Sequence, residues 1–250
     1  MRIVSLVPSQ TELLYNLGLD DEVAGITKFC IHPQHWFKTK YKVGGTKTVN
    51  IEKVAALKPT LIIANKEENV KEQVEALQQI APVYVSDIST LQDALEMINT
   101  VGELTNKQAE SANIIFQITK GFQQLKFATN SPGQNIRAAY LIWQNPYMAA
   151  GGDTFINDMM QHCGWVNVFA GKTRYPEVSA EQISAHKCQV LMLSSEPFPF
   201  KQKHVDELQA LLPDTKIILV DGEMFSWYGS RLLLAPNYFK SLLKDLQLIH

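Results

Sequence analysis

One segment of the chain occurs twice. Residues 52–64 align without a gap on residues 181–193, so equivalent positions differ by 129 in residue number. Each copy has the pattern of a short amphipathic helix, which turns through a lysine into an apolar run typical of a buried strand. The same spacing places Glu196 opposite Glu67, just beyond the carboxyl end of each strand. A repeat that extends over about half the chain predicts two similar lobes.

The order of the predicted elements indicates the fold class. Apolar runs at residues 2–7, 23–26, 61–64 and 83–85 alternate with helix-like segments at 9–18, 51–57, 70–80 and 91–104. The scheme resumes with strands at 138–143 and 166–169 and a helix at 153–163 between them. Such alternation predicts an α/β fold with parallel sheets covered by helices on both faces. Residues 27–43 and 144–152 are expected to be long connections.

Three helix starts carry capping signals. Ser9 and Glu12 have the spacing of a capping box, Asn50 precedes the helix at 51–57, and Thr154 follows two glycines. Asp153 and Thr154 are first of all capping residues, although the backbone amides beside them are also suited to a polar ligand group.

The longest predicted helix, residues 106–127, lies between the two repeats. Its apolar residues recur at steps of three or four: Ala109, Ala112, Ile115, Phe116, Ile118, Phe122 and Leu125. Thr105 is expected to cap its start, and the Asn-Ser-Pro-Gly run at 130–133 to break the chain after it. An ordinary surface helix of a single sheet is the alternative. The repeat favours a connector, with a lobe at residues 1–104, the helix at 105–128 and a second lobe at 129–250.

Composition excludes several classes of protein. The net charge of −2 and the absence of clustered Lys and Arg argue against a nucleic acid or an anionic membrane as a partner. Three scattered cysteines are too few for a disulfide framework. No apolar run approaches the roughly 18 residues of a membrane span. The first residues lack the apolar core and cleavage site of a secretory signal, so no signal peptide is predicted in the chain as written.

The segments that follow the strands are the candidate binding loops, because ligands gather at the carboxyl ends of parallel strands. Two lobes facing each other would form a cleft. Three of the four tryptophans fall in these segments, at Trp36, Trp143 and Trp227, together with Tyr147 and several phenylalanines. Aromatic side chains on binding loops suit a large, flat and partly apolar ligand.

Searches for catalytic motifs give no candidate. The chain has no Gly-x-Ser-x-Gly sequence, and the Gly-Lys-Thr at 171–173 lacks the leading glycine of a phosphate loop. The Ser-x-x-Lys spacing at 241–244 lies within an amphipathic helix pattern and has no companion motifs. No catalytic residues are therefore predicted.

Two other features leave alternatives open. Cys30, His32 and His35 form the one cluster of soft ligands, and they bind a metal, line the cleft or simply form part of a loop. Arg231 pairs with Glu196 or Asp221, or it binds a carboxylate of the ligand.

Several motifs together resemble those of class III periplasmic solute-binding proteins. They are the opening IVSLVPSQTELLYNLG, the loop GITKFCIHP, the VGG at 43–45, the block IEKVAALKPTLIIAN, the long helix, the AAGGDTF segment and the closing SWYGSRLL. Members of this family capture cobalamin, iron-siderophores or haem for ABC transporters. The cobalamin-binding branch is the closest in pattern.

The resemblance implies two Rossmann-like lobes joined by a single rigid helix, with the ligand in a cleft between the lobes and an acid on each lobe that docks on the permease. Asn65 stands where the best-known cobalamin binder has a pocket tryptophan. Glu72 and Glu223 are the approximate counterparts of the docking acids. The residues expected to contact the ligand are Ser9, Cys30, His32, Asn65, Trp143, Tyr147, Glu196, Trp227 and Arg231.

The expected function is therefore that of the substrate-binding component of an ABC-type importer, which captures a corrinoid or another metal chelate. Such a protein is not an enzyme and is expected to be a monomer without an intrinsic cofactor or resident metal. The family implies the periplasm or the cell envelope as its location. A cytosolic metal-handling protein or enzyme that uses Cys30, His32 and His35 on the same fold is the alternative.

Overall fold

The chain folds into two units in a computed structural model that describes residues 1–129 and 136–246. Unit 1 comprises Met1–Ile88, Gln92–Gln117 and Tyr228–Arg231. Unit 2 comprises Ser89–Leu91, Ile118–Trp227 and the described residues from Leu232 onward. These units are defined by their internal contacts, and the domain boundaries predicted after residues 104 and 128 stay a prediction.

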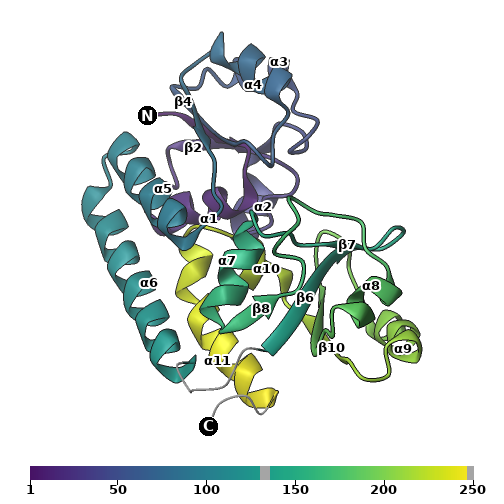
Figure 1. Cartoon of the computed structure of the whole chain (residues 1–250). Helices are drawn as coiled ribbons and strands as arrows, with labels where there is room; N and C mark the ends of the chain where they lie inside the picture. Colours follow the sequence, from purple (N-terminus) through teal and green to yellow (C-terminus); the bar gives the residue numbers. More distant parts are fainter. Residues whose placement is uncertain (130–135, 247–250) are drawn as a thin grey trace. The chain divides into compact units, whose positions relative to one another are not determined.

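Unit 1 is built on a five-stranded parallel sheet with the strand order β3-β2-β1-β4-β5. Figure 1 shows helices α3 and α4 on one side of this sheet and α1 and α5 on the other. The strands are β1 (Ile3–Ser5), β2 (Val23–Ile26), β3 (Tyr41–Lys42), β4 (Leu61–Asn65) and β5 (Val83–Ser86). The helices are α1 (Pro8–Asn16), α2 (Gln34–Thr39), α3 (Ile51–Ala56), α4 (Lys71–Gln78) and α5 (Leu91–Leu104).

Unit 2 has a mixed sheet in which β8, β6, β9 and β10 run parallel and β7 pairs with β6 in the antiparallel direction. Its strands are β6 (Ile136–Trp143), β7 (Met148–Ala149), β8 (Trp165–Asn167), β9 (Val190–Ser194) and β10 (Lys216–Val220). Its helices are α7 (Phe155–His162), α8 (Ala180–Ala185), α9 (Gln202–Leu211), α10 (Gly222–Ser226) and α11 (Ala235–Asp245), with a 3₁₀ turn at Ser230–Leu233. Strand β7 lies in the segment predicted to be a loop.

Alternate residues of the central strands of unit 2 point into two different cores. Leu141 and Leu193 pack in one apolar cluster with Ile183 of α8 and Leu208 of α9. Tyr140, on the opposite face, has its ring 5.1 Å from that of Phe225 in α10. Figure 1 shows α8 and α9 on one side of the sheet and α7, α10 and α11 on the other. Both faces of the sheet are thus covered by helices, as the alternation of elements predicts.

The internal repeat is confirmed at the level of single elements. Helix α8 begins and ends 129 residues after α3, and strand β9 begins and ends 129 residues after β4. Asn50 and Ser179 occupy equivalent positions in the two copies. The side chain of each caps the N-terminus of its helix by accepting a hydrogen bond from the backbone amide three residues later. The two lysines after these helices, Lys58 and Lys187, both adopt positive φ angles, 48° and 51°.

Glycine at either of these lysine positions is expected to stabilise the protein. A left-handed conformation is strained for a residue with a Cβ atom and is common for glycine after a helix. Both lysines are exposed, so their side chains contribute little packing. Lys58→Gly and Lys187→Gly should each raise the free energy of unfolding by about 0.5–1 kcal/mol, measured by urea denaturation. Lys58→Ala keeps the strain, and a gain of equal size in that variant would contradict this explanation.

Two predicted helix caps, Ser9 and Thr105, are wrong. Ser9 lies inside α1, which begins at Pro8 with Val7 as its N-cap, because proline has no amide hydrogen and fits the first helical turn. The Thr105 hydroxyl donates to the carbonyl of Val101, 2.7 Å away, and so belongs to the end of α5. The predicted connection at 27–43 also contains α2 and β3.

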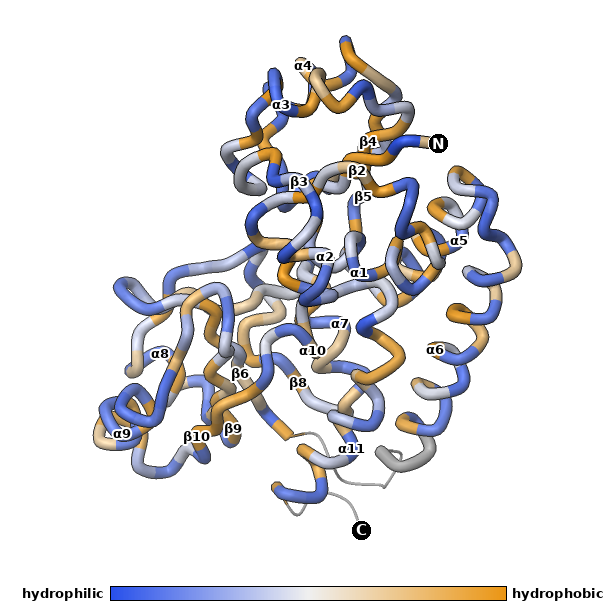
Figure 2. The backbone as a smooth tube through the Cα atoms, turned by 180° about the vertical axis from the view of Figure 1, so that it is seen from behind, coloured by the Kyte–Doolittle hydropathy of each residue, from blue (hydrophilic) through white to orange (hydrophobic). Residues whose placement is uncertain are grey.

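The long helix is α6 (Gln108–Thr129), and Figure 2 shows hydrophilic and hydrophobic residues alternating along it. Its buried residues are Ser111, Ile114, Ile118, Phe122 and Leu125. The predicted face is therefore right in its second half and wrong in its first, where Phe116 is 66% exposed. Ser111 lies against Gly102 of α5, where an added Cβ atom would be 2.1 Å from the serine hydroxyl oxygen. This close approach of two small residues is not visible in an apolar pattern. The chain break predicted at 130–133 lies outside the described residues.

Helix α6 contributes residues to both units, which meet along the chain between Gln117 and Ile118. Two further stretches cross between units: Ser89–Leu91 belongs to unit 2 and Tyr228–Arg231 to unit 1. Within the described ranges no helix is long and apolar enough to cross a membrane.

Candidate functional site

Aromatic side chains gather where two neighbouring strands of unit 2 end. Trp143 is the last residue of β6 and is 41% exposed, and its ring lies 5.7 Å from that of Phe198, which follows β9. Phe198 also contacts Phe200 and His204, at 4.8 and 5.4 Å between ring centroids. These four residues form an aromatic platform, and the exposed face of Trp143 is available to a flat ligand.

The sheet holds this platform in place. The amide of Phe198 donates to the carbonyl of Ile142, 3.3 Å away, which ties the loop after β9 to the end of β6. The ring nitrogen Nδ1 of His204 accepts from the Lys201 amide at 2.8 Å, at the start of α9. Tyr147, another predicted contact, is half-buried against the apolar cluster that includes Phe200. The sequence offered no signal for His204, because it lies within an otherwise ordinary amphipathic helix.

Two predicted site residues, Glu196 and Trp227, contact each other directly. The Glu196 carboxylate oxygen Oε1 accepts hydrogen bonds from the Trp227 indole nitrogen and from the Ser226 hydroxyl, both at 2.8 Å. Trp227 is 7% exposed, so its indole is mostly enclosed by the protein. Burial raises the pKa of the Glu196 carboxyl, and the nearby negative charge of Glu223 acts in the same direction, whereas the bond from Ser226 lowers it.

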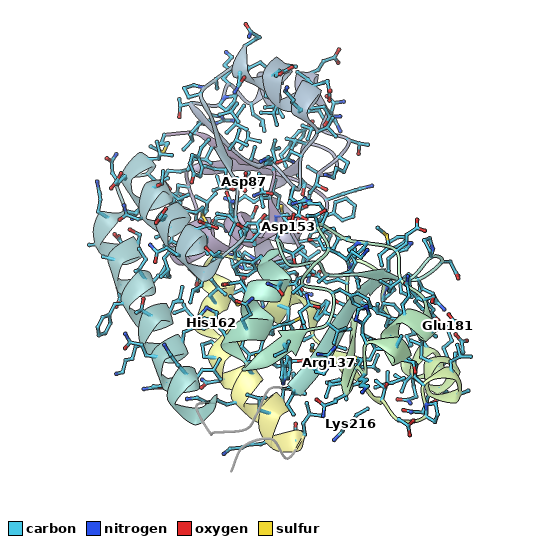
Figure 3. The ribbon with its side chains drawn as sticks, in the orientation of Figure 1. Asp87, Arg137, Asp153, His162, Glu181 and Lys216 are labelled. Carbon is cyan, nitrogen blue, oxygen red and sulfur yellow. The ribbon has the colours of Figure 1, made fainter. Side chains whose placement is uncertain are left out.

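This raised pKa predicts a pH dependence of stability. Because the folded state holds the Glu196 proton more tightly than the unfolded chain, stability should fall as the pH rises above the ordinary value of 4.5 and through the raised pKa. The difference in free energy of unfolding between the wild type and Glu196→Gln, measured by urea denaturation, should decrease over that interval. Glu181 (Figure 3) is the matched control, since a hydrogen bond from Ser179 lowers its pKa. The difference measured with Glu181→Gln should change in the opposite sense, and equal signs would contradict the assignment.

Arg231 has a different partner from those predicted. Its guanidinium donates from Nε and Nη2 to the two carboxylate oxygens of Glu12, at 3.0 and 2.7 Å. The two side chains are 10% and 15% exposed. Glu12 belongs to α1, so this ion pair joins two segments of unit 1. The two-pronged ion pair occupies Arg231, so a direct role in binding a ligand carboxylate is not supported by its geometry.

Three other predicted contacts are buried inside unit 1. Ser9 is 5% exposed, on α1. The Cys30 thiol is fully buried and lies 3.1 Å from the Thr11 hydroxyl, and burial raises its pKa. Asn65, 1% exposed, donates to the Ser86 carbonyl at 3.0 Å and accepts from the backbone amides of the turn that follows β4. The side chains of Cys30 and Asn65 are thus buried and hydrogen-bonded within unit 1, and their predicted contact with a ligand stays a prediction.

The soft-ligand cluster is not assembled as a metal site. Cys30 is buried beside Thr11 and Thr27, whereas the ring of His35 lies 5.2 Å from that of Tyr15 on α1. Across the described part of the chain, no three His, Cys, Asp or Glu side chains are grouped so that they would hold a metal ion. His32 is half-buried in the segment before α2, and its predicted contact with a ligand stays a prediction.

The remaining candidates are polar residues at helix starts. Thr154 caps α7 by accepting from the Asn157 amide, as predicted, and Asp153 (Figure 3) accepts from the backbone amide of Arg174. Glu72 is exposed in the first turn of α4, and Glu223 is half-buried in the first turn of α10. Of the two predicted docking acids, Glu72 is thus the more accessible.

Comparison with known proteins agrees with this fold. A family model described as periplasmic binding protein matches residues 3–212. A vitamin B12-binding protein of Yersinia pestis (strain Pestoides F) is 27% identical over 243 residues, which cover 94% of this chain and 84% of that protein.

Two solved structures show the same architecture. The periplasmic vitamin B12 binding protein BtuF of Vibrio cholerae has a TM-score of 0.83 and 25% identity, and the match covers 98% of this chain and 97% of that one. The periplasmic heme binding protein HutB of Vibrio cholerae also has a TM-score of 0.83, at 20% identity, with 97% and 98% covered, and shows the fold alone. The predicted α/β fold and the resemblance read from the motifs are both confirmed. The family model matches most of the length of the chain, which therefore belongs to the periplasmic binding protein family.

Proposed function

We propose that this protein is the substrate-binding component of an ABC-type importer and that it captures cobalamin or a related corrinoid. The similarity to the vitamin B12-binding proteins, which extends over nearly the whole chain, is the observation that carries the proposal. Members of the family bind solutes and are not enzymes, which agrees with the absence of a catalytic motif from the sequence.

The aromatic platform supports a ligand of this kind. A corrin ring is broad and partly apolar, and the partly exposed Trp143 offers it a rigid aromatic surface at low entropic cost. We place the contacts made by unit 2 on Trp143, Phe198 and Tyr147. Cys30 and Asn65 are left out of the proposed contacts because their side chains are engaged inside unit 1.

The proposed partner is a membrane permease, reached from the periplasm or the cell envelope. Glu72 carries an exposed carboxylate in the first turn of α4, where it is accessible to a basic residue of a partner protein. Glu223 is the proposed counterpart in unit 2. The protein is proposed to act as a monomer, without a resident metal or cofactor.

Spectral titration with cyanocobalamin tests the ligand directly. The corrin absorbance and the tryptophan fluorescence should both change and saturate at one ligand per chain. Haemin and a ferric siderophore serve as comparison ligands. If cyanocobalamin gives no signal at tens of micromolar while one of the comparison ligands saturates, the corrinoid assignment is wrong and the importer role stands. Silence with all three would contradict the proposed function.

A further inference from the structure

The segment Ser226–Arg231, which runs from the last residue of α10 into the 3₁₀ turn, is anchored at its two ends by carboxylates. Ser226 and Trp227 are the last residues of unit 2 before the chain passes into unit 1, and Tyr228–Arg231 belongs to unit 1. We call Ser226–Arg231 the crossover segment. Glu196 accepts hydrogen bonds at one end and Glu12 at the other.

At the unit 2 end, one carboxylate oxygen fixes two consecutive side chains. The Ser226 hydroxyl and the Trp227 indole nitrogen both donate to Oε1 of Glu196 at 2.8 Å. These bonds set the orientation of the indole, because a tryptophan ring has a single donor atom. Glu196 is itself held by the end of β9, where its amide donates to the Ser194 hydroxyl oxygen at 3.3 Å.

At the unit 1 end, the segment lies on α1. Arg231 forms its two-pronged ion pair with Glu12, and Asn16 donates to the Ser230 hydroxyl oxygen at 2.8 Å. Gly229 has a φ angle of 117°, and a Cβ atom there would lie 3.1 Å from the carbonyl oxygen of Ser9. The chain therefore approaches α1 more closely than a larger residue would allow in this conformation.

We infer that Glu196 is a positioning residue for ligand binding, which acts by holding the crossover segment and the Trp227 indole in one conformation. The inference rests on the proposed function. Glu196 lies two residues beyond β9, at the carboxyl end of the sheet, where binding loops of α/β proteins lie, and it holds the start of the segment there. A binding loop that is already ordered spares the ligand the entropic cost of ordering it.

The chemistry of Glu196 favours a role in ligand binding over a role in stabilising the fold alone. A buried carboxylate destabilises a fold unless strong hydrogen bonds compensate for lost hydration. Burial raises the pKa of Glu196 despite its two bonds, so the compensation is incomplete. Destabilising groups of this kind are typical of functional sites. Both bonds are accepted by the same oxygen, Oε1, which gives that oxygen the role of holding Ser226 and Trp227.

The test compares Glu196→Ala, Glu196→Gln and the exposed control Glu181→Ala (Figure 3). Affinity for cyanocobalamin is measured by titration, and the tryptophan environment by near-ultraviolet circular dichroism of the free protein. Glu196→Ala should weaken binding about tenfold and change the tryptophan signal, because the Trp227 indole nitrogen loses its acceptor. Glu196→Gln keeps an acceptor oxygen, so its affinity for cyanocobalamin and its near-ultraviolet circular dichroism should both be close to the wild-type values. Glu181→Ala should change neither.

A double variant separates positioning from direct contact. Trp227→Phe removes the indole donor, so adding Glu196→Ala to it should weaken binding by clearly less than tenfold. Additive losses, or equal losses in Glu196→Ala and Glu196→Gln, would overturn the inference. If the wild type binds no chelate, the proposed function fails separately. In that case the circular dichroism of the free protein tests the positioning role, which an unchanged signal in Glu196→Ala overturns.

Discussion

Replacing Trp143 by alanine is expected to weaken cobalamin binding by about 30-fold, the loss typical of a central aromatic anchor. Trp143 is 41% exposed at the end of β6, and its ring contacts Phe198. Much of its surface is therefore free to be covered by a ligand. The free energy of unfolding should change by less than about 1 kcal/mol, because a partly exposed side chain contributes less to the core.

Phe116→Ala is the matched control for this experiment. Phe116 is also an exposed aromatic side chain, 66% exposed on α6, and it lies outside the aromatic platform. Its removal should leave affinity within about twofold of the wild type. Titration calorimetry of the three proteins gives the comparison. Wild-type affinity in Trp143→Ala, or an equal loss in Phe116→Ala, would show that the platform does not bind the ligand.

The largest expected effect on stability follows from the ion pair of Arg231 and Glu12. Arg231→Met removes one partner and leaves the Glu12 carboxylate in a site where it is 15% exposed. A carboxylate that loses its ion-pair partner at such a site should lower the free energy of unfolding by about 3 kcal/mol. Urea denaturation measures this loss, and the same value is expected for Glu12→Leu.

The double variant Arg231→Met/Glu12→Leu distinguishes a charge effect from a packing effect. Replacing both members of a buried ion pair with apolar residues is often nearly neutral, so the double variant should be within about 1 kcal/mol of the wild type. If the two single losses add, the cause is packing rather than the unpaired charge, and the account of the ion pair is wrong.

The fold was largely predictable because a repeat constrains it twice. The helix and the strand of the second copy each begin and end 129 residues after those of the first. The equivalent lysines, Lys58 and Lys187, both have a left-handed backbone, a feature that the sequence of neither copy reveals. The buried face of α6 was predicted only in part. Ser111 takes the place of an apolar residue there because Gly102 lets the helices approach closely, and hydrophobic periodicity does not detect small polar residues at such contacts.

The site was harder to predict than the fold. The contact of Glu196 with Trp227 joins residues 31 positions apart, and that of Arg231 with Glu12 joins residues 219 apart. No local pattern pairs such residues, so the sequence analysis considered Glu12 only as a capping residue and did not predict its ion pair with Arg231. Cys30 and Asn65 lie at or after strand ends and so resembled binding residues. In the structure Cys30 contacts Thr11 and Thr27, and Asn65 accepts from the turn that follows β4, all within unit 1.

The central claim is that this protein captures a metal chelate, and native mass spectrometry tests it most directly. The purified protein is mixed with equal amounts of cyanocobalamin, haemin and a ferric siderophore, desalted, and weighed intact. One corrinoid should remain bound per chain, and the bound fraction should fall in Trp143→Ala and not in Phe116→Ala. A spectrum that shows only the free chain, at concentrations of protein and chelates in the tens of micromolar, would contradict the claim.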